Sequence, residues 1–131
     1  MTSAAPPHAI HLCRAYDARA GAPTFGARLL VDRLWPRGIA KADLTLDAWL
    51  KDVTPSPALR IWFGHDPARW TEFRQAYLAE LQNAPLAVEG ALAWCHKGPV
   101  TLIYAARDSE HTHALVLRDH LAARLSQEGC P

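Results

Sequence analysis

The chain has 131 residues, 50% of them hydrophobic, so it is long enough to bury one core without help from disulfides or a structural metal. Its 14 lysines and arginines against 13 aspartates and glutamates give a net charge of +1. This balance argues against a protein that works chiefly by coating nucleic acid or an anionic membrane, although it is compatible with a local basic pocket.

The cysteines and the N-terminus indicate a cytoplasmic protein. Cys13, Cys95 and Cys130 are odd in number and form no Cys-x-x-Cys pair, so neither a disulfide framework nor a structural zinc site is expected. Residues 1–7 are rich in Ala, Pro and Ser, lack the features of a secretory signal, and are expected to be disordered. No stretch approaches ~18 consecutive apolar residues, so no membrane span or membrane partner is predicted.

The first half of the chain alternates predicted strands with turns. Residues 10–16 alternate in polarity and predict a strand, and residues 17–26 contain two glycines and a proline, which predict a loop. Residues 28–34 include a continuous apolar run, which is typical of a strand covered on both faces. Pro36 and Gly38 end that strand, and Thr45 is expected to cap a short helix that continues to Lys51.

Two further helices are predicted from their boundary residues. Ser56 followed by Pro57 is a strong helix start, and Asp66-Pro67 repeats the signal for a helix that continues to about Asn83. This helix has an apolar stripe that consists of Trp70, Phe73, Tyr77 and Leu81.

The last third of the chain predicts a helix, a strand and a helix. The first helix spans residues 86–96 and ends at Gly98-Pro99. Residues 100–105 form the second apolar strand. Asp108 or Ser109 is expected to cap a final helix over residues 111–127, with a stripe of Ala114, Leu117, Leu121 and Leu125.

Apolar strands separated by helical patterns predict an α/β fold. We expect a small, mostly parallel β-sheet flanked by helices, in a single three-layer domain that covers residues 1–131.

In open parallel sheets, ligands bind beyond the carboxyl ends of the strands. Polar side chains follow both apolar strands, and His111 and His113 lie at the start of the last helix. If the two strands are parallel, these side chains share one edge of the sheet and form a cleft that favours a phosphate or carboxylate. The residues concerned are Asp32, Arg33, Arg37, Tyr104, Arg107, Asp108, His111 and His113.

Roles follow from side-chain chemistry. Arg33, Arg37 and Arg107 are expected to hold the anion, with Trp35 and Tyr104 in the same ligand-binding set. His113 or His65 is expected to transfer protons, with Asp32 orienting an arginine or a histidine, because imidazole titrates near neutral pH.

Each of these residues also has a structural interpretation. Asp32 could pair with Arg33 or Arg37 simply to hold the turn, and Arg107 could be a solvated loop residue. His113 could be a hydrogen-bonded histidine at the edge of the core, and His65 could pack on Trp62 or bond a helix carbonyl. The choice between binding and catalysis therefore stays open.

Two other functions are weighed against a small anionic ligand. One is a nucleic-acid-associated or protein-partner module, which the balanced charge weakens. The other is a metal site built from His65, His111 and His113, although the spacing places no acidic third partner beside the last two. The chain has no glycine-rich dinucleotide motif, phosphate-binding loop or nucleophile elbow, so no cofactor is predicted.

The string Val-Asp-Arg-Leu-Trp-Pro-Arg-Gly at residues 31–38 resembles the hallmark of a bacterial branch of the domain of unknown function 488 family. The resemblance extends over nearly the whole chain after Tyr16. Further matching segments are Leu46-Asp47-x-Trp49-x-Lys51, Thr54-Pro55-Ser56, Leu59-Arg60, Trp62-Phe63-x-His65, Arg69-Trp70-x-x-Phe73, Tyr77-x-x-Glu80-Leu81, Leu102-x-Tyr104-Ala105-Ala106 and His113-Ala114-x-Val116-Leu117.

The resemblance implies a compact α/β domain with no established activity. The broader family has a strand that ends in Asp-Val-Arg and a later strand that leads to a Cys-His-Arg element. This chain has Thr112 in place of that cysteine, Ala114 in place of the arginine, and Tyr104 where another cysteine often lies. Thiol or metal chemistry of the broader family is therefore not transferred to this chain.

Overall fold

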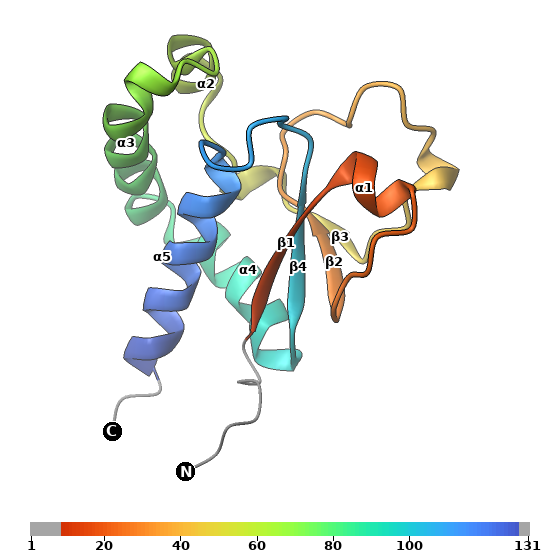
Figure 1. Ribbon diagram of the computed structural model, residues 1–131. Coiled ribbons are helices and arrows are strands. Elements are labelled where there is room, and N and C mark those ends of the chain that lie inside the picture. Colours follow the sequence, from red (N-terminus) through yellow and green to blue (C-terminus); the bar gives the residue numbers. More distant parts are fainter. Residues whose placement is uncertain (1–8, 129–131) are drawn as a thin grey trace.

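The strands form one parallel sheet, shown in the computed structural model of Figure 1, which describes residues 9–128. The sheet order is β1-β4-β2-β3, and every neighbouring pair is parallel. In chain order the elements are β1 (Ile10–Arg14), α1 (Ala15–Arg19), β2 (Ala27–Leu30), the 3-10 helix η1 (Lys41–Asp43), β3 (Ala48–Trp49), η2 (Lys51–Val53), α2 (Pro57–Phe63), η3 (Pro67–Arg69), α3 (Trp70–Gln82), α4 (Pro85–Lys97), β4 (Val100–Tyr104) and α5 (His113–Glu128).

Helices cover both faces of this sheet, which confirms the predicted three-layer α/β architecture (Figure 1). On one face Leu29 and Leu102 are fully buried in a cluster with α3, α4 and α5. On the other face Leu30 and Ile103 are buried with Ala15 of α1. The predicted continuous apolar runs therefore correspond to strands with a helix layer on each side.

The central strands β2 and β4 have their carboxyl ends at the same edge of the sheet. Leu30 lies opposite Ile103 in the register, and the Val31 amide extends the ladder by donating to the Ile103 carbonyl over 2.9 Å. The edge lies at the top of Figure 1, where α2 and the start of α5 are also found. The loops after β2 and β4 therefore emerge side by side, as the sequence predicted.

The predicted helix starts and stops are mostly confirmed. The Ser56 hydroxyl accepts from the Leu59 amide at the start of α2, and Gly64 ends that helix with φ 53°. The Asp66 side chain caps η3 by accepting from the Ala68 amide, so regular α-helix begins only at Trp70. α4 ends at Lys97, immediately before Gly98, as predicted.

Two predicted segments are wrong. The helix expected from Thr45 to Lys51 is absent, because its backbone pairs with the edge of β2: Leu50 donates to the Leu30 carbonyl over 2.8 Å, and this segment forms strand β3 and then η2. The loop expected over residues 17–26 is wrong at its start, because residues 17–19 belong to helix α1. Since α1 begins at Ala15, the first strand ends at Arg14.

The last helix also starts later than predicted. Asp108 does not cap it, since its carboxylate accepts from the Glu110 and His111 amides in the preceding turn. Thr112 lies immediately before α5, and its hydroxyl accepts from the Ala114 amide over 3.4 Å. The stripe Ala114, Leu117, Leu121 and Leu125 is buried, as expected.

None of the helices formed by residues 9–128 has the length and apolar character that crossing a lipid bilayer requires. The prediction for residues 1–7 lies outside the described residues.

Candidate anion-binding site

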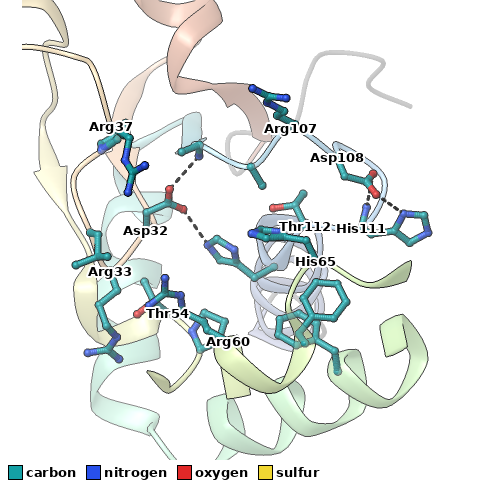
Figure 2. A pocket seen from close by; sticks show the side chains of 18 of the residues that line it. Asp32, Arg33, Arg37, Thr54, Arg60, His65, Arg107, Asp108, His111 and Thr112 are labelled. Carbon is teal, nitrogen blue, oxygen red and sulfur yellow. Dashed lines mark hydrogen bonds and ion pairs between the residues drawn. The ribbon is translucent and has the colours of Figure 1, made fainter. Parts of the chain in front are cut away.

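A pocket of about 800 Å³ opens at the carboxyl edge of the sheet (Figure 2). Its walls come mainly from the loop after β2, from the residues that follow η2, from α2, and from the loop between β4 and α5. Predicted site residues that line it are Asp32, Arg33, Trp35, Arg37, His65, Arg107, Asp108, His111 and His113. Chain segments that are far apart in sequence therefore supply one concave surface.

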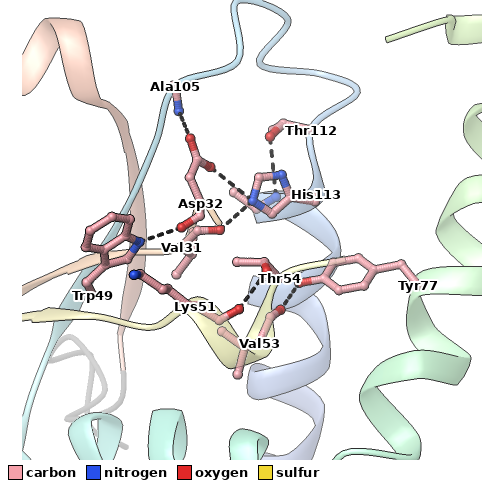
Figure 3. A network of polar contacts seen from close by, with 11 residues as sticks. Val31, Asp32, Trp49, Lys51, Val53, Thr54, Tyr77, Ala105, Thr112 and His113 are labelled. Carbon is pink, nitrogen blue, oxygen red and sulfur yellow. Dashed lines mark hydrogen bonds and ion pairs between the residues drawn. The ribbon is translucent and has the colours of Figure 1, made fainter. Parts of the chain in front are cut away.

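Asp32 joins the elements that meet at the floor of this pocket (Figure 3). Its Oδ2 accepts from the Ala105 amide over 2.9 Å, which ties the end of β2 to the end of β4. Its backbone carbonyl accepts from Trp49 Nε1 over 2.6 Å, which adds β3. Its Oδ1 lies 3.2 Å from His113 Nε2 at the start of α5. The ion pair considered from the sequence, between Asp32 and Arg33 or Arg37, is not formed.

The hydrogen bonds of His113 fix where its proton lies. Nε2 is 2.6 Å from the Val31 carbonyl, which can only accept, so Nε2 must carry hydrogen. A neutral His113 ring therefore has its unprotonated nitrogen at Nδ1. Because the Nε2–H is used by the carbonyl, Asp32 Oδ1 stays buried without a hydrogen-bond partner among residues 9–128, and its contact with the ring is electrostatic.

Four arginines line the pocket, and none of them forms an ion pair with another residue in the described part of the chain. Arg37 and Arg107 lie toward the top of Figure 2, whereas Arg33 and Arg60 lie toward the lower left. Arg33 is half-buried, and its Nε is buried without an acceptor among residues 9–128. The only carboxylates that line the pocket are Asp32 and Asp108, so its lining has an excess of positive charge.

Side chains from α1 and β1 hold the loops that present these arginines. The Tyr16 hydroxyl donates to the Arg37 carbonyl over 2.8 Å. Arg14 Nε donates to the Ala106 carbonyl over 2.9 Å, next to Arg107. These bonds fix the backbone and leave the guanidinium groups of Arg37 and Arg107 available.

Trp35 forms part of the wall and is itself held in place. Its Nε1 donates to the Ile39 carbonyl over 2.7 Å, and its ring meets the Trp49 ring edge-on at a centroid distance of 5.5 Å. The Trp-Pro-Arg-Gly turn therefore has a rigid aromatic residue beside the pocket.

The part of the wall that follows η2 is held by a buried hydrogen bond. The Tyr77 hydroxyl of α3 donates to the Val53 carbonyl of η2, and Thr54 and Pro55 follow at the pocket surface. Burial raises the pKa of Tyr77 well above its ordinary value, so this hydroxyl stays protonated as a donor. Phe63 stacks on Phe73 with ring centroids 4.3 Å apart and closes the apolar side of the same wall.

The other two histidines of the pocket differ in their surroundings. His111 Nδ1 donates to Asp108 Oδ2 over 2.7 Å, and this bond holds the pKa of the Asp108 carboxyl below its ordinary value. His65 is exposed and adopts φ 56°, a left-handed conformation that costs a non-glycine residue about 1–2 kcal/mol. Among residues 9–128, no group of three or more His, Cys, Asp or Glu side chains is arranged to hold a metal ion, so the histidine metal site considered from the sequence is not assembled.

Tyr104 does not line this pocket, in contrast to its predicted placement in the ligand-binding set. It shares the period-2 alternation of Leu102, which directs both side chains into the helix-covered core. Its remaining exposed surface faces a second, shallower depression beside Cys13 and Arg14. Burial also raises the pKa of its hydroxyl.

Arg60 is the main site residue that strand-end reasoning missed. It lies on α2 rather than after a strand, so the topology rule does not select it. The available signal was the Leu59-Arg60 segment among the matching family motifs.

Comparison with known proteins shows that most of the chain is shared with relatives. A family model described as the inactive DUF488-N3 subclade matches residues 9–130. The uncharacterised protein YeaO of Escherichia coli (strain K12) is 47% identical over 96 residues, which cover 73% of this chain and 84% of YeaO. The uncharacterised protein Rv3073c of Mycobacterium tuberculosis (strain H37Rv) is 40% identical over 102 residues, which cover 78% of this chain and 86% of that protein. No solved structure shows significant similarity to the chain.

Proposed function

We propose that this chain, which belongs to the domain of unknown function 488 family, binds a small organic anion such as a phosphate ester, a nucleotide or a carboxylate in the pocket at the carboxyl edge of its sheet. The observation that supports this proposal is the presence of four arginines without carboxylate partners around one concave surface. Guanidinium groups match phosphate and carboxylate geometry, and small-molecule sites typically combine a concave surface with a few such polar groups.

The structure and the family description favour binding over turnover. The matching subclade is described as inactive, and Asp32 Oδ2 and the His113 Nε2–H are both hydrogen-bonded to backbone groups. In this proposal His113 and Asp32 position the ends of β2 and β4, and the arginines contact the ligand. Proton transfer by His113, His65 or Asp32 stays a prediction, as does the cytoplasmic location.

Thermal unfolding in the presence of ligands tests the proposal. Inorganic phosphate, sugar phosphates, nucleotides and small carboxylates at millimolar concentration are expected to raise the Tm by mass action. Arg37→Gln and Arg60→Gln are each expected to weaken binding at least about tenfold, because each removes a charge-assisted hydrogen bond of ~1.5–3 kcal/mol.

Arg74→Gln is the matched control, because Arg74 is exposed on α3, has no ion-pair partner in the described chain and does not line the pocket. It removes the same charge and is expected to leave ligand affinity within about twofold. A Tm that no anion changes would contradict the proposal. A short single-stranded oligonucleotide belongs in the same panel, since salt-dependent binding of that probe alone would support the nucleic-acid alternative.

A further inference from the structure

The pocket has an apolar component as well as a cationic one. Leu34, in the loop after β2, and Ile61, on α2, both line it. Their side chains are 64% and 80% exposed, so they form part of its open rim. Trp35 and Phe63 continue the apolar lining from the same two segments.

A single exposed leucine is common on any protein and needs no explanation. Here, however, two exposed aliphatic side chains from segments about 27 residues apart border one pocket whose other residues include four arginines. An anion alone leaves these side chains in water, whereas a ligand with an apolar part removes them from it.

The volume of the pocket supports the same conclusion. At about 800 Å³ it lies within the ~300–1,000 Å³ range of sites for drug-sized ligands, and it is far larger than an inorganic phosphate, which has the size of a few water molecules. A ligand that fills it needs a substituent of considerable size in addition to its charged group.

We propose, resting on the proposed anion binding, that the ligand is an amphiphilic organic anion: a phosphate monoester or carboxylate with an aromatic or bulky aliphatic substituent, its charged group held by the arginines and its substituent covering Leu34 and Ile61. The rigid Trp35 ring supplies the flat surface against which an aromatic substituent packs. The pocket is therefore expected to select ligands that have both a charged group and an apolar substituent.

Titration calorimetry with three probes tests this inference. Methyl phosphate reports the cationic component, benzyl alcohol reports the apolar component, and phenyl phosphate combines the two. Phenyl phosphate is expected to bind at least about tenfold more tightly than methyl phosphate, because it buries its ring against the rim. Benzyl alcohol is expected to bind more weakly than either phosphate.

A variant of the rim and a control variant test whether Leu34 and Ile61 cause the preference for phenyl phosphate. Leu34→Ser combined with Ile61→Ser is expected to reduce the preference for phenyl phosphate to less than about threefold and to leave methyl phosphate affinity unchanged. Leu86→Ser is the matched control, since Leu86 is 87% exposed and lies outside the pocket. The Tm of each variant shows that it is folded.

The outcomes separate this inference from the proposed function. Equal affinity for methyl and phenyl phosphate would overturn the amphiphilic ligand and leave anion binding intact. Absence of binding by both phosphates would overturn both. A phenyl phosphate preference that survives in the Leu34→Ser, Ile61→Ser variant would overturn the assignment of the rim.

Discussion

Gly26 and Gly38 both have positive φ, but their surroundings give them different constraints. Gly26 has φ 67°, and a Cβ added there would lie 1.8 Å from the Pro99 carbonyl oxygen, an impossible contact. Gly38 has φ 82°, but an added Cβ would meet nothing within 4 Å. The close approach at Gly26 allows Ala27 at the start of β2 to donate to the same Pro99 carbonyl over 3.1 Å.

Gly26→Ala is therefore expected to lower the free energy of unfolding by about 3 kcal/mol or more, because β2 must move away from β4. Gly38→Ala is expected to cost only ~1–2 kcal/mol, the price of a left-handed alanine without a clash. Urea unfolding of both variants measures the difference. Equal losses would show that backbone conformation alone, and not the contact with Pro99, determines the effect at Gly26.

At this scale the sequence identified most of the charged residues and histidines of the pocket but not their pairings. From the sequence, Asp32 could pair with the nearby Arg33 or Arg37, or orient an arginine or a histidine. Its partner is His113, more than 80 residues away, because the parallel register of β2 and β4 directs the Asp32 carboxylate toward the start of α5. Such a pairing depends on long-range packing, which residue spacing does not encode.

At the scale of elements, helix α5 contains a histidine, His120, whose packing disfavours the charged form of its ring. Burial, with a smaller contribution from Arg124, lowers the pKa of His120 below its ordinary value. Its Nε2 is buried and has no hydrogen-bond partner among residues 9–128. The folded protein therefore binds a proton at His120 less readily than the unfolded chain does.

As the pH falls through the ordinary histidine pKa of about 6.5, the unfolded chain gains a proton at this position before the folded chain does, so the free energy of unfolding must decrease. His120→Gln is expected to flatten the decrease in stability between about pH 7 and pH 5. Denaturant unfolding across this range, compared with the unsubstituted chain, measures the slope. An unchanged slope would assign the pH dependence to other groups.

The elements also show where local sequence signals fail. The boundaries of α2 and α4 were predictable because Ser, Pro and Gly act on their own neighbours. The segment around Trp49 has apolar spacing that suits a short helix, but the free edge of β2 supplies hydrogen-bond partners, and the segment becomes a strand of two residues. A partner that lies elsewhere in the chain overrides local propensity there.

For the whole molecule, Asp32 is the point at which the central strands and α5 are joined. Its carboxylate satisfies the Ala105 amide after β4 and faces His113 on α5. Because Asp32 lies at the floor of the pocket, the integrity of the fold and of the site are coupled through this one residue.

Asp32→Ala is expected to reduce the free energy of unfolding by about 1–3 kcal/mol, since it leaves the partly buried Ala105 amide without an acceptor. Asp32→Asn keeps an acceptor oxygen and is expected to reduce the free energy of unfolding by less than Asp32→Ala does. Asp119→Ala, at an exposed ion pair with Arg118, is the control and is expected to change stability by under ~0.5 kcal/mol. A loss at Asp32→Ala as small as that of the control would show that Asp32 has no structural role.

The overall architecture was predictable because continuous apolar strands between amphipathic helices are compatible with few alternatives to a parallel sheet. The order of the strands was not, because nothing in the pattern of β1, β2 and β4 shows that the last of them lies between the other two. The contribution of α2 to the pocket, through Arg60 and Ile61, was not predictable either, because the position of this helix depends on tertiary packing.

The central place of β4 has a consequence for how the protein is made. Of the strands in residues 9–128, β4 is the last to be synthesised, yet it alone pairs with both β1 and β2. A nascent chain that ends before residue 100 can pair β2 with β3, but it has no strand to place between β1 and β2. The complete sheet, and with it the pocket, can therefore form only when the C-terminal quarter has left the ribosome.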